Sequence, residues 1–178
     1  ALPISIELLQ RIKVEHPIGV VTNHVVSEQV KKIATIGVEP FVDELVVSEE
    51  VGVAKPDARI FETALSRLGG TPDDAIMIGD SWSSDILGAT EMGIRAIWLN
   101  RYDRPCPDSS LATEIRSLEP VDDVVDHLAA ESLRLLAKVV HERRTHATLG
   151  EAGIVLDLGR QRQLTAGLLA READRLEV

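Results

Sequence analysis

Short apolar runs alternate along the chain with longer stretches in which apolar residues recur every three or four positions. The short runs, which end in glycine or polar residues, predict buried strands, and the helical spacing predicts helices that cover them. This alternation predicts an α/β fold with a doubly wound parallel sheet and crossover helices. We expect strands at 18–23, 45–48, 75–79 and 96–100, and helices at 4–13, 27–36, 56–68, 84–92 and 118–128.

Polar side chains stand where two of these strands end. Thr22 and Asn23 end the first strand, and Asp80 ends the third, with Asp85 following five residues later. Lys55 precedes a proline that suits the first turn of a helix. Ligands of doubly wound sheets bind at the carboxyl ends of the strands, so these side chains predict a phosphate site in which the acids hold a hard cation. Alternatively, Asp80 caps the next helix and Asp85 is a solvated acid of its first turn.

These segments resemble, in order and spacing, three motifs of the haloacid dehalogenase (HAD) superfamily. Thr22-Asn23 is similar to the second motif, Lys55 to the third, and Asp80 with Asp85 to the fourth. The resemblance covers roughly residues 3–129. It implies a Rossmann-like sheet of the HAD type, and phosphoryl transfer through an aspartyl-phosphate with Mg²⁺ as cofactor.

The resemblance also implies a role for each of these residues. Thr22 donates a hydrogen bond to the phosphate, and Lys55 pairs with the phosphate and the nucleophile. Asp80 binds Mg²⁺, whereas Asp85 binds the metal directly or through water, or holds Lys55 in place. Asn23 orients its neighbours or touches the substrate.

The family's first motif, a strand that ends in the nucleophilic aspartate, does not precede Thr22 in this sequence. A sheet of this type needs a strand at its centre, because the neighbouring strands would otherwise bury unpaired backbone groups. The apolar run 152–159 contains Asp157 and resembles a first motif in which Gly159 replaces the second acid. One interpretation is therefore a circularly permuted chain, with Asp157 as the nucleophile and as a third ligand of Mg²⁺.

In the other interpretation, residues 130–178 form a helical extension and the nucleophile lies outside this chain. The residues after Gly159 do not match the family's usual continuation, which counts against permutation. A glycine there also cannot act as general acid, so a permuted enzyme would be slow or limited to good leaving groups. Both interpretations divide the chain into a HAD-like core, 1–129, and a mainly helical C-terminal segment, 130–178.

The composition narrows the choice of partners. The formal net charge of −10 argues against nucleic acid or an anionic membrane, and we expect a small phosphorylated substrate. Cys106 is the one cysteine, so no intrachain disulfide can form, which favours a reducing, cytoplasmic location. No apolar run is long enough to span a bilayer. An oligomer could form through the C-terminal helical segment.

The function that these features favour is a Mg²⁺-dependent phosphatase acting on small phosphate monoesters. A second hypothesis, supported by the missing first motif, is a non-catalytic HAD-like domain used for binding or oligomerisation. A third is another HAD chemistry such as dehalogenation, against which the pair Asp80 and Asp85 speaks. Arg101 and Tyr102 follow the last expected strand, at the edge of the predicted site, and either contact the substrate or form a solvated loop, the interpretation that we favour. His24 is either a pocket or a surface residue.

Overall fold

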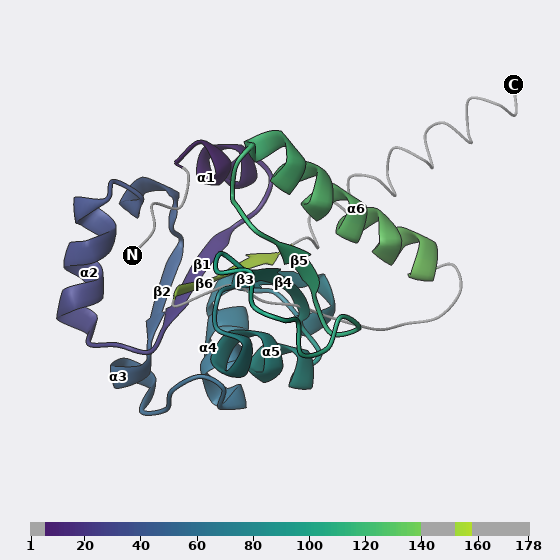
Figure 1. Ribbon diagram of the computed structural model, residues 1–178. Coiled ribbons are helices and arrows are strands. Elements are labelled where there is room, and N and C mark those ends of the chain that lie inside the picture. The colour runs from purple at the N-terminus through teal and green to yellow at the C-terminus, as the bar shows by residue number, and fades with distance from the viewer. Residues whose placement is uncertain (1–5, 140–151, 158–178) are drawn as a thin grey trace, which may run out of the picture.

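A six-stranded sheet with helices packed on both of its faces forms the body of the molecule (Figure 1). The computed structural model describes residues 6–139 and 152–157. The strands are β1 (Ile18–Thr22), β2 (Glu44–Val47), β3 (Ala75–Gly79), β4 (Arg95–Leu99), β5 (Thr113–Ile115) and β6 (Ala152–Asp157). The α-helices are α1 (Ile6–Lys13), α2 (Val26–Thr35), α3 (Ser48–Val51), α4 (Ala58–Leu68), α5 (Leu87–Glu91) and α6 (Val121–Val139). Short 3₁₀ turns cover Glu39–Phe41 and Pro72–Asp74, and a π turn covers Trp82–Ile86.

The strands lie in the order β2-β1-β6-β3-β4-β5. The pairs β1–β2, β3–β4 and β4–β5 are parallel, in agreement with the predicted α/β fold. In these pairs Thr22 lies beside Val47, and Gly79 lies beside Trp98. The carboxyl ends of the parallel strands therefore meet at one edge of the sheet, where the loops after β1, β3 and β4 leave it.

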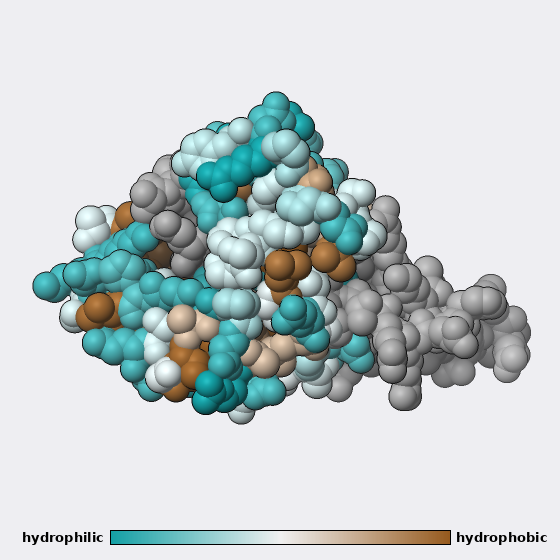
Figure 2. Space-filling view, turned by 60° about the horizontal axis from the view of Figure 1, so that its bottom comes forward, coloured by the Kyte–Doolittle hydropathy of each residue, from teal (hydrophilic) through white to brown (hydrophobic). Residues whose placement is uncertain are grey.

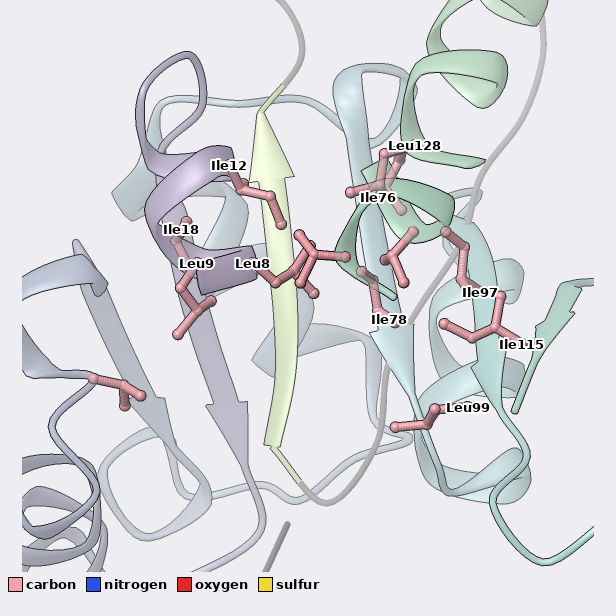
Figure 3. Packing of buried hydrophobic residues seen from close by; sticks show 13 residues of the cluster. Leu8, Leu9, Ile12, Ile18, Ile76, Ile78, Ile97, Leu99, Ile115 and Leu128 are labelled. Atoms are coloured by element: carbon pink, nitrogen blue, oxygen red, sulfur yellow. The ribbon is translucent and has the colours of Figure 1, made fainter. Parts of the chain in front are cut away.

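The central strand, β6, runs antiparallel to both of its neighbours (Figure 3). Ile154 lies opposite Val20 on one side and opposite Ile78 on the other. Residues 152–157 thus lie at the centre of the sheet, the place that the permuted interpretation gives to the run 152–159, but they do not run parallel to their neighbours. Because of this direction, Ala152 lies beside Thr22, whereas Asp157 lies beside Ala75 at the opposite edge.

Two hydrophobic cores lie on the two faces of the sheet, because successive side chains of a strand point to opposite faces. Ile76 and Ile78 of β3 pack in one core with Leu8 of α1 (Figure 3). Met77, between them, packs in the other core with Phe61 of α4. Figure 1 shows α1 and α6 over the first face, and α4 and α5 over the second. Both cores consist mainly of aliphatic side chains.

Several element boundaries differ from the predicted ones for local reasons. α4 begins after Pro56, because the Asp57 carboxylate accepts the backbone N–H of Arg59 at 3.0 Å and caps the helix. The expected helix 84–92 divides into the π turn and α5. β5 was not predicted, since its three residues are too few to show a period. α6 crosses the expected boundary at residue 129 as one helix. The expectations for 140–151 and 158–178, Gly159 included, fall outside the described residues.

The surface seen in Figure 2 is mainly hydrophilic, with hydrophobic residues in small separate patches. The exposed large hydrophobic side chains of the described residues are few, namely Ile6, Val14, Val25, Val30 and Tyr102. None of the described helices is both long enough and apolar enough to cross a bilayer.

Candidate functional site

A cavity of about 580 Å³ lies at the carboxyl ends of β1 and β4 and in the loops that follow β1, β3 and β4. Its lining is almost entirely polar, with four side chains that carry a positive charge and one carboxylate. This local excess of positive charge stands out in a chain whose formal net charge is −10. The lining residues are Thr22, Asn23, His24, Gln29, Lys32, Lys55, Asp80, Ser81, Ser84, Trp98, Leu99, Asn100, Arg101, Tyr102 and Arg104.

Asn23 fixes the loop that carries Lys55. Its side-chain oxygen accepts the backbone N–H of Lys55 at 2.6 Å, and its amide nitrogen donates to the backbone oxygen of Lys55 at 2.9 Å. This pair of hydrogen bonds ties the loop before α4 to the end of β1. Of the two roles expected for Asn23, the geometry fits that of orienting its neighbours.

The Lys55 ammonium lies in a fixed position below the cavity. It donates to the backbone oxygen of Val21 at 2.8 Å and forms an ion pair with the Asp85 carboxylate at 2.8 Å. The two side chains are 1 % and 0 % exposed, so neither charge is screened by bulk water. The second oxygen of Asp85 accepts the backbone N–H of Ser81 at 3.0 Å.

Burial raises the pKa of Asp85, because loss of solvent disfavours its charged form more than Lys55 and the Ser81 N–H favour it. Both carboxylate oxygens of Asp85 are engaged, and Asp85 is not part of the cavity lining. Of the three roles expected for Asp85, holding Lys55 in place is the one that this geometry fits. A direct metal contact does not fit it.

Asp80 is the carboxylate of the cavity lining. It follows β3 directly, and its Oδ2 receives a hydrogen bond from the Arg101 guanidinium at 2.8 Å. The Trp98 indole N–H donates to the backbone oxygen of Asp80 at 3.2 Å, and the Trp98 ring meets that of Trp82 edge to face at 5.0 Å. The loop after β3 is therefore anchored to β4, and the side chain of Asp80 is held at the cavity.

Thr22 is the last residue of β1 and is 2 % exposed. Among the contacts of the residues that the structure describes, its hydroxyl has no hydrogen-bond partner. A buried hydroxyl that lines a cavity without a partner is a group that a ligand or a water molecule can satisfy. Its position fits the role expected for it, that of a donor to a bound phosphate.

The structure brings Thr22, Lys55 and Asp80 together at one cavity, as the sequence predicts. It does not bring Asp157 to them, because the antiparallel register of β6 places that residue beside Ala75 at the far edge of the sheet. Within residues 6–139 and 152–157, no cluster of three or more acidic, histidine or cysteine side chains could hold a metal ion. Of the three predicted ligands of Mg²⁺, Asp80, Asp85 and Asp157, Asp80 is the one in the described cavity lining. One carboxylate together with phosphate oxygens and water is a usual environment for Mg²⁺, so the site fits a cation shared with a bound phosphate.

Sequence reasoning missed several residues of the lining. Asn100 follows β4 directly, the same signal that identified Asp80, and it closes its own loop by accepting the N–H of Arg104 at 2.9 Å. Arg101 and Tyr102 line the cavity, which fits the less favoured of their two interpretations, and Tyr102 is also 70 % exposed. His24 also lines the cavity and lies 3.0 Å from the Glu28 carboxylate. Gln29 and Lys32 gave no signal in the sequence, because their role depends on which face of α2 meets the cavity.

Comparison with known proteins agrees with the family resemblance and with the predicted fold. Residues 2–99 match the family model of haloacid dehalogenase-like hydrolases. The chain is 45% identical over 83 residues to a glyceraldehyde 3-phosphate phosphatase of Methanothermobacter thermautotrophicus, over 47% of this chain and 37% of that protein. It is 37% identical over 127 residues to the pyrimidine 5'-nucleotidase YjjG of Escherichia coli, over 70% of this chain and 56% of that protein.

Solved structures show the same fold. A HAD phosphatase from Thermococcus onnurineus superposes with a TM-score of 0.63 at 29% identity, over 70% of this chain and 58% of that one. A magnesium-bound HAD-hydrolase, YfnB from Bacillus subtilis, superposes with a TM-score of 0.64 at 26% identity, over 70% of this chain and 56% of that one. The chain spans about a third to about a half of the length of the curated relatives described above.

Proposed function

Since the chain belongs to the family of haloacid dehalogenase-like hydrolases, we propose that its cavity binds the phosphate of a small phosphate monoester in a Mg²⁺-dependent phosphatase. The observation that carries this proposal is the meeting of Thr22, Lys55 and Asp80 at one cavity with an excess of positive charge. The names of the relatives support it, because they include a glyceraldehyde 3-phosphate phosphatase and a nucleotidase.

Each side chain has a definite part in this proposal. The Thr22 hydroxyl donates a hydrogen bond to a phosphate oxygen, and the buried Lys55 ammonium attracts the phosphate charge. Asp85 keeps that ammonium in position, and Asn23 keeps its loop in position. Asp80 holds Mg²⁺ against the phosphate, and the ion supplies neutralisation of the charge that develops during transfer.

The nucleophile of an aspartyl-phosphate mechanism needs a second carboxylate at this edge of the sheet. Asp85 is engaged by Lys55, and Asp157 lies beside Ala75 in the register of β6. We therefore favour the second of the two sources considered above, a carboxylate from outside this chain. In that case the chain contributes the phosphate-binding and cation-binding part of an active site.

The direct test is hydrolysis of p-nitrophenyl phosphate with and without Mg²⁺ by the wild-type chain, Asp80→Asn and Asp157→Asn. We expect Asp157→Asn to match the wild type in turnover and in Mg²⁺-dependent binding of orthophosphate, because this residue is placed away from the cavity. In Asp80→Asn, Mg²⁺ should no longer affect either the turnover of p-nitrophenyl phosphate or the binding of orthophosphate. Turnover by the wild type that disappears in Asp157→Asn would contradict this assignment and establish the permuted arrangement instead.

A non-catalytic phosphate-binding domain is the second candidate. It is favoured by one observation, namely that the described part of the lining offers Asp80 but no second acid for attack on phosphorus. Turnover of p-nitrophenyl phosphate by the chain, alone or together with the protein part that supplies the carboxylate, would exclude this candidate. Binding of orthophosphate with no turnover in either case would support it.

A further inference from the structure

Gln29 is a buried polar side chain that the proposed phosphate chemistry does not use. It lies in the first turns of α2, is 3 % exposed and lines the cavity. Among the contacts of the described residues, its side-chain amide has no hydrogen-bond partner. Because the side chain reaches the cavity, a ligand or a water molecule there can complete its hydrogen bonds.

Thr22 shows the same combination of features in the same cavity. It too is almost wholly buried, lines the cavity, and has no side-chain hydrogen bond among the described residues. In the proposed function that hydroxyl receives the phosphate. Gln29, on a different element, therefore marks a second point at which a ligand is contacted.

Lys32 gives this second point a positive charge. It follows Gln29 by three residues, so the two side chains project from the same face of α2, and both line the cavity. The other buried or half-buried cations of the lining are paired, Lys55 with Asp85 and Arg101 with Asp80. In the described part of the chain Lys32 has no ion pair, so its charge is not cancelled by a neighbouring acid.

We propose that Gln29 and Lys32 form a second anion subsite, which binds a carboxylate or a second phosphate of the substrate. This inference rests on the proposed function and assigns its substrate class: phosphate monoesters that carry another anionic group. The Gln29 amide donates a hydrogen bond to the anion, and the Lys32 ammonium adds a charge-assisted one. The cavity, at about 580 Å³, lies within the usual range for small-molecule pockets, ~300–1,000 Å³, and has room for an organic group beyond the phosphate.

The test is a calorimetric titration, in the presence of Mg²⁺, with four probes: orthophosphate, glycerol 3-phosphate, 3-phosphoglycerate and fructose 1,6-bisphosphate. Glycerol 3-phosphate and 3-phosphoglycerate have the same number of carbons, but only the second has a carboxylate. We expect the wild type to bind 3-phosphoglycerate, the bisphosphate, or both at least about tenfold more tightly than glycerol 3-phosphate, a difference typical of one charge-assisted contact. If 3-phosphoglycerate binds more tightly than the bisphosphate, the second subsite prefers a carboxylate. If the bisphosphate binds more tightly, the subsite prefers a phosphate.

Variants on α2 show whether the tighter binding comes from the subsite itself or from the net charge of the helix. Lys32→Gln and Gln29→Met should each remove most of the preference and leave the affinity for orthophosphate unchanged. Lys31→Gln is the matched control, because it removes one charge from the same helix at an exposed position outside the cavity lining. It should keep the preference.

The outcomes that overturn the inference are distinct from those that overturn the proposed function. If the wild type binds glycerol 3-phosphate, 3-phosphoglycerate and fructose 1,6-bisphosphate equally, with orthophosphate still bound, the second subsite is ruled out and the phosphate site remains. An equal loss in Lys31→Gln and Lys32→Gln also overturns it, since the effect then belongs to net charge. Failure to bind orthophosphate at all overturns the proposed function, and the subsite with it.

Discussion

Lys55 and Asp85 form an ion pair whose side chains are almost wholly enclosed by protein. Removing two charges from water is costly, so a buried pair of this kind adds little net stability. Its value here is positional, because it holds a positive charge at the sheet edge where Thr22 and Asp80 also lie. Removal of one partner alone leaves the other charge buried without compensation.

The single variant Asp85→Leu should therefore lower the free energy of unfolding by about 3–5 kcal/mol. The double variant Lys55→Met/Asp85→Leu should recover most of that loss, because no isolated charge remains. Urea unfolding of both variants and the wild type measures the two values. A double variant that is no more stable than Asp85→Leu would show that the intact pair itself stabilises the fold.

At the scale of the elements, two glycines differ in what an added methyl group would meet. At Gly88 of α5 a Cβ atom would lie 2.8 Å from the Cα of Pro56 and 2.8 Å from a ring carbon of Phe61. At Gly19 of β1 it would lie 2.8 Å from Leu68, whose side-chain end can rotate away. The first contact joins the helix after Asp85 to the loop of Lys55, so it bears on the site.

Gly88→Ala should cost about 1–3 kcal/mol in the free energy of unfolding, because the backbone at Pro56 must move. Gly19→Ala should cost less, since only the Leu68 side chain has to shift. Chemical denaturation of the two variants side by side measures the difference. A larger loss for Gly19→Ala would mean that α5 and the Lys55 loop are not packed as closely as described.

The sequence predicted the strands of the sheet better than its helices and its central strand. A strand such as β3 is buried on both faces, so its apolar run is visible and its ends fall at Ala75 and Gly79 as expected. The start of α4 depends on a single capping bond of Asp57, and such a bond leaves little trace in an apolar pattern. The direction of β6 could not be predicted at all, because an apolar run has the same pattern read either way.

The residues of the candidate site also differ in how well the sequence predicts them. Thr22 ends one strand and Asp80 directly follows another, so topology alone brings them to one edge. The nearly complete burial of Asp85 and the exposure of Gln29 and Lys32 to the cavity depend on the packing of the π turn and of α2, which no short motif encodes.

At the scale of the whole molecule, the central position of β6 means that the stability of the sheet should depend on this strand. Ile154 is paired with Val20 and with Ile78, so a proline there removes a backbone donor from the middle of the sheet. Ile154→Pro should unfold the chain or lower its stability by about 3 kcal/mol or more, with loss of amide-exchange protection in β1 and β3. Glu44→Pro on the edge strand β2 is the control and should lower the stability less. The Asp43 N–H donates to the backbone oxygen of Ile18, so the N–H of Glu44 points away from β1 and its loss breaks no bond of the sheet. Unchanged protection in Ile154→Pro would show that β6 is not the central strand.

The most direct test of the account is whether the cavity binds phosphate through Thr22. Orthophosphate should be titrated into the wild type, Thr22→Val and Thr63→Val in the presence of Mg²⁺, with heat as the readout. Thr63 is half-buried on α4, outside the cavity lining, and its hydroxyl donates to the Arg59 backbone oxygen, so that variant controls for loss of a threonine hydroxyl away from the cavity. We predict that the wild type and Thr63→Val bind with equal affinity, and that Thr22→Val binds at least about tenfold more weakly, since a hydrogen bond to a charged group contributes about 1.5–3 kcal/mol. Equal affinity of Thr22→Val and the wild type would contradict the placement of the phosphate at this edge of the sheet.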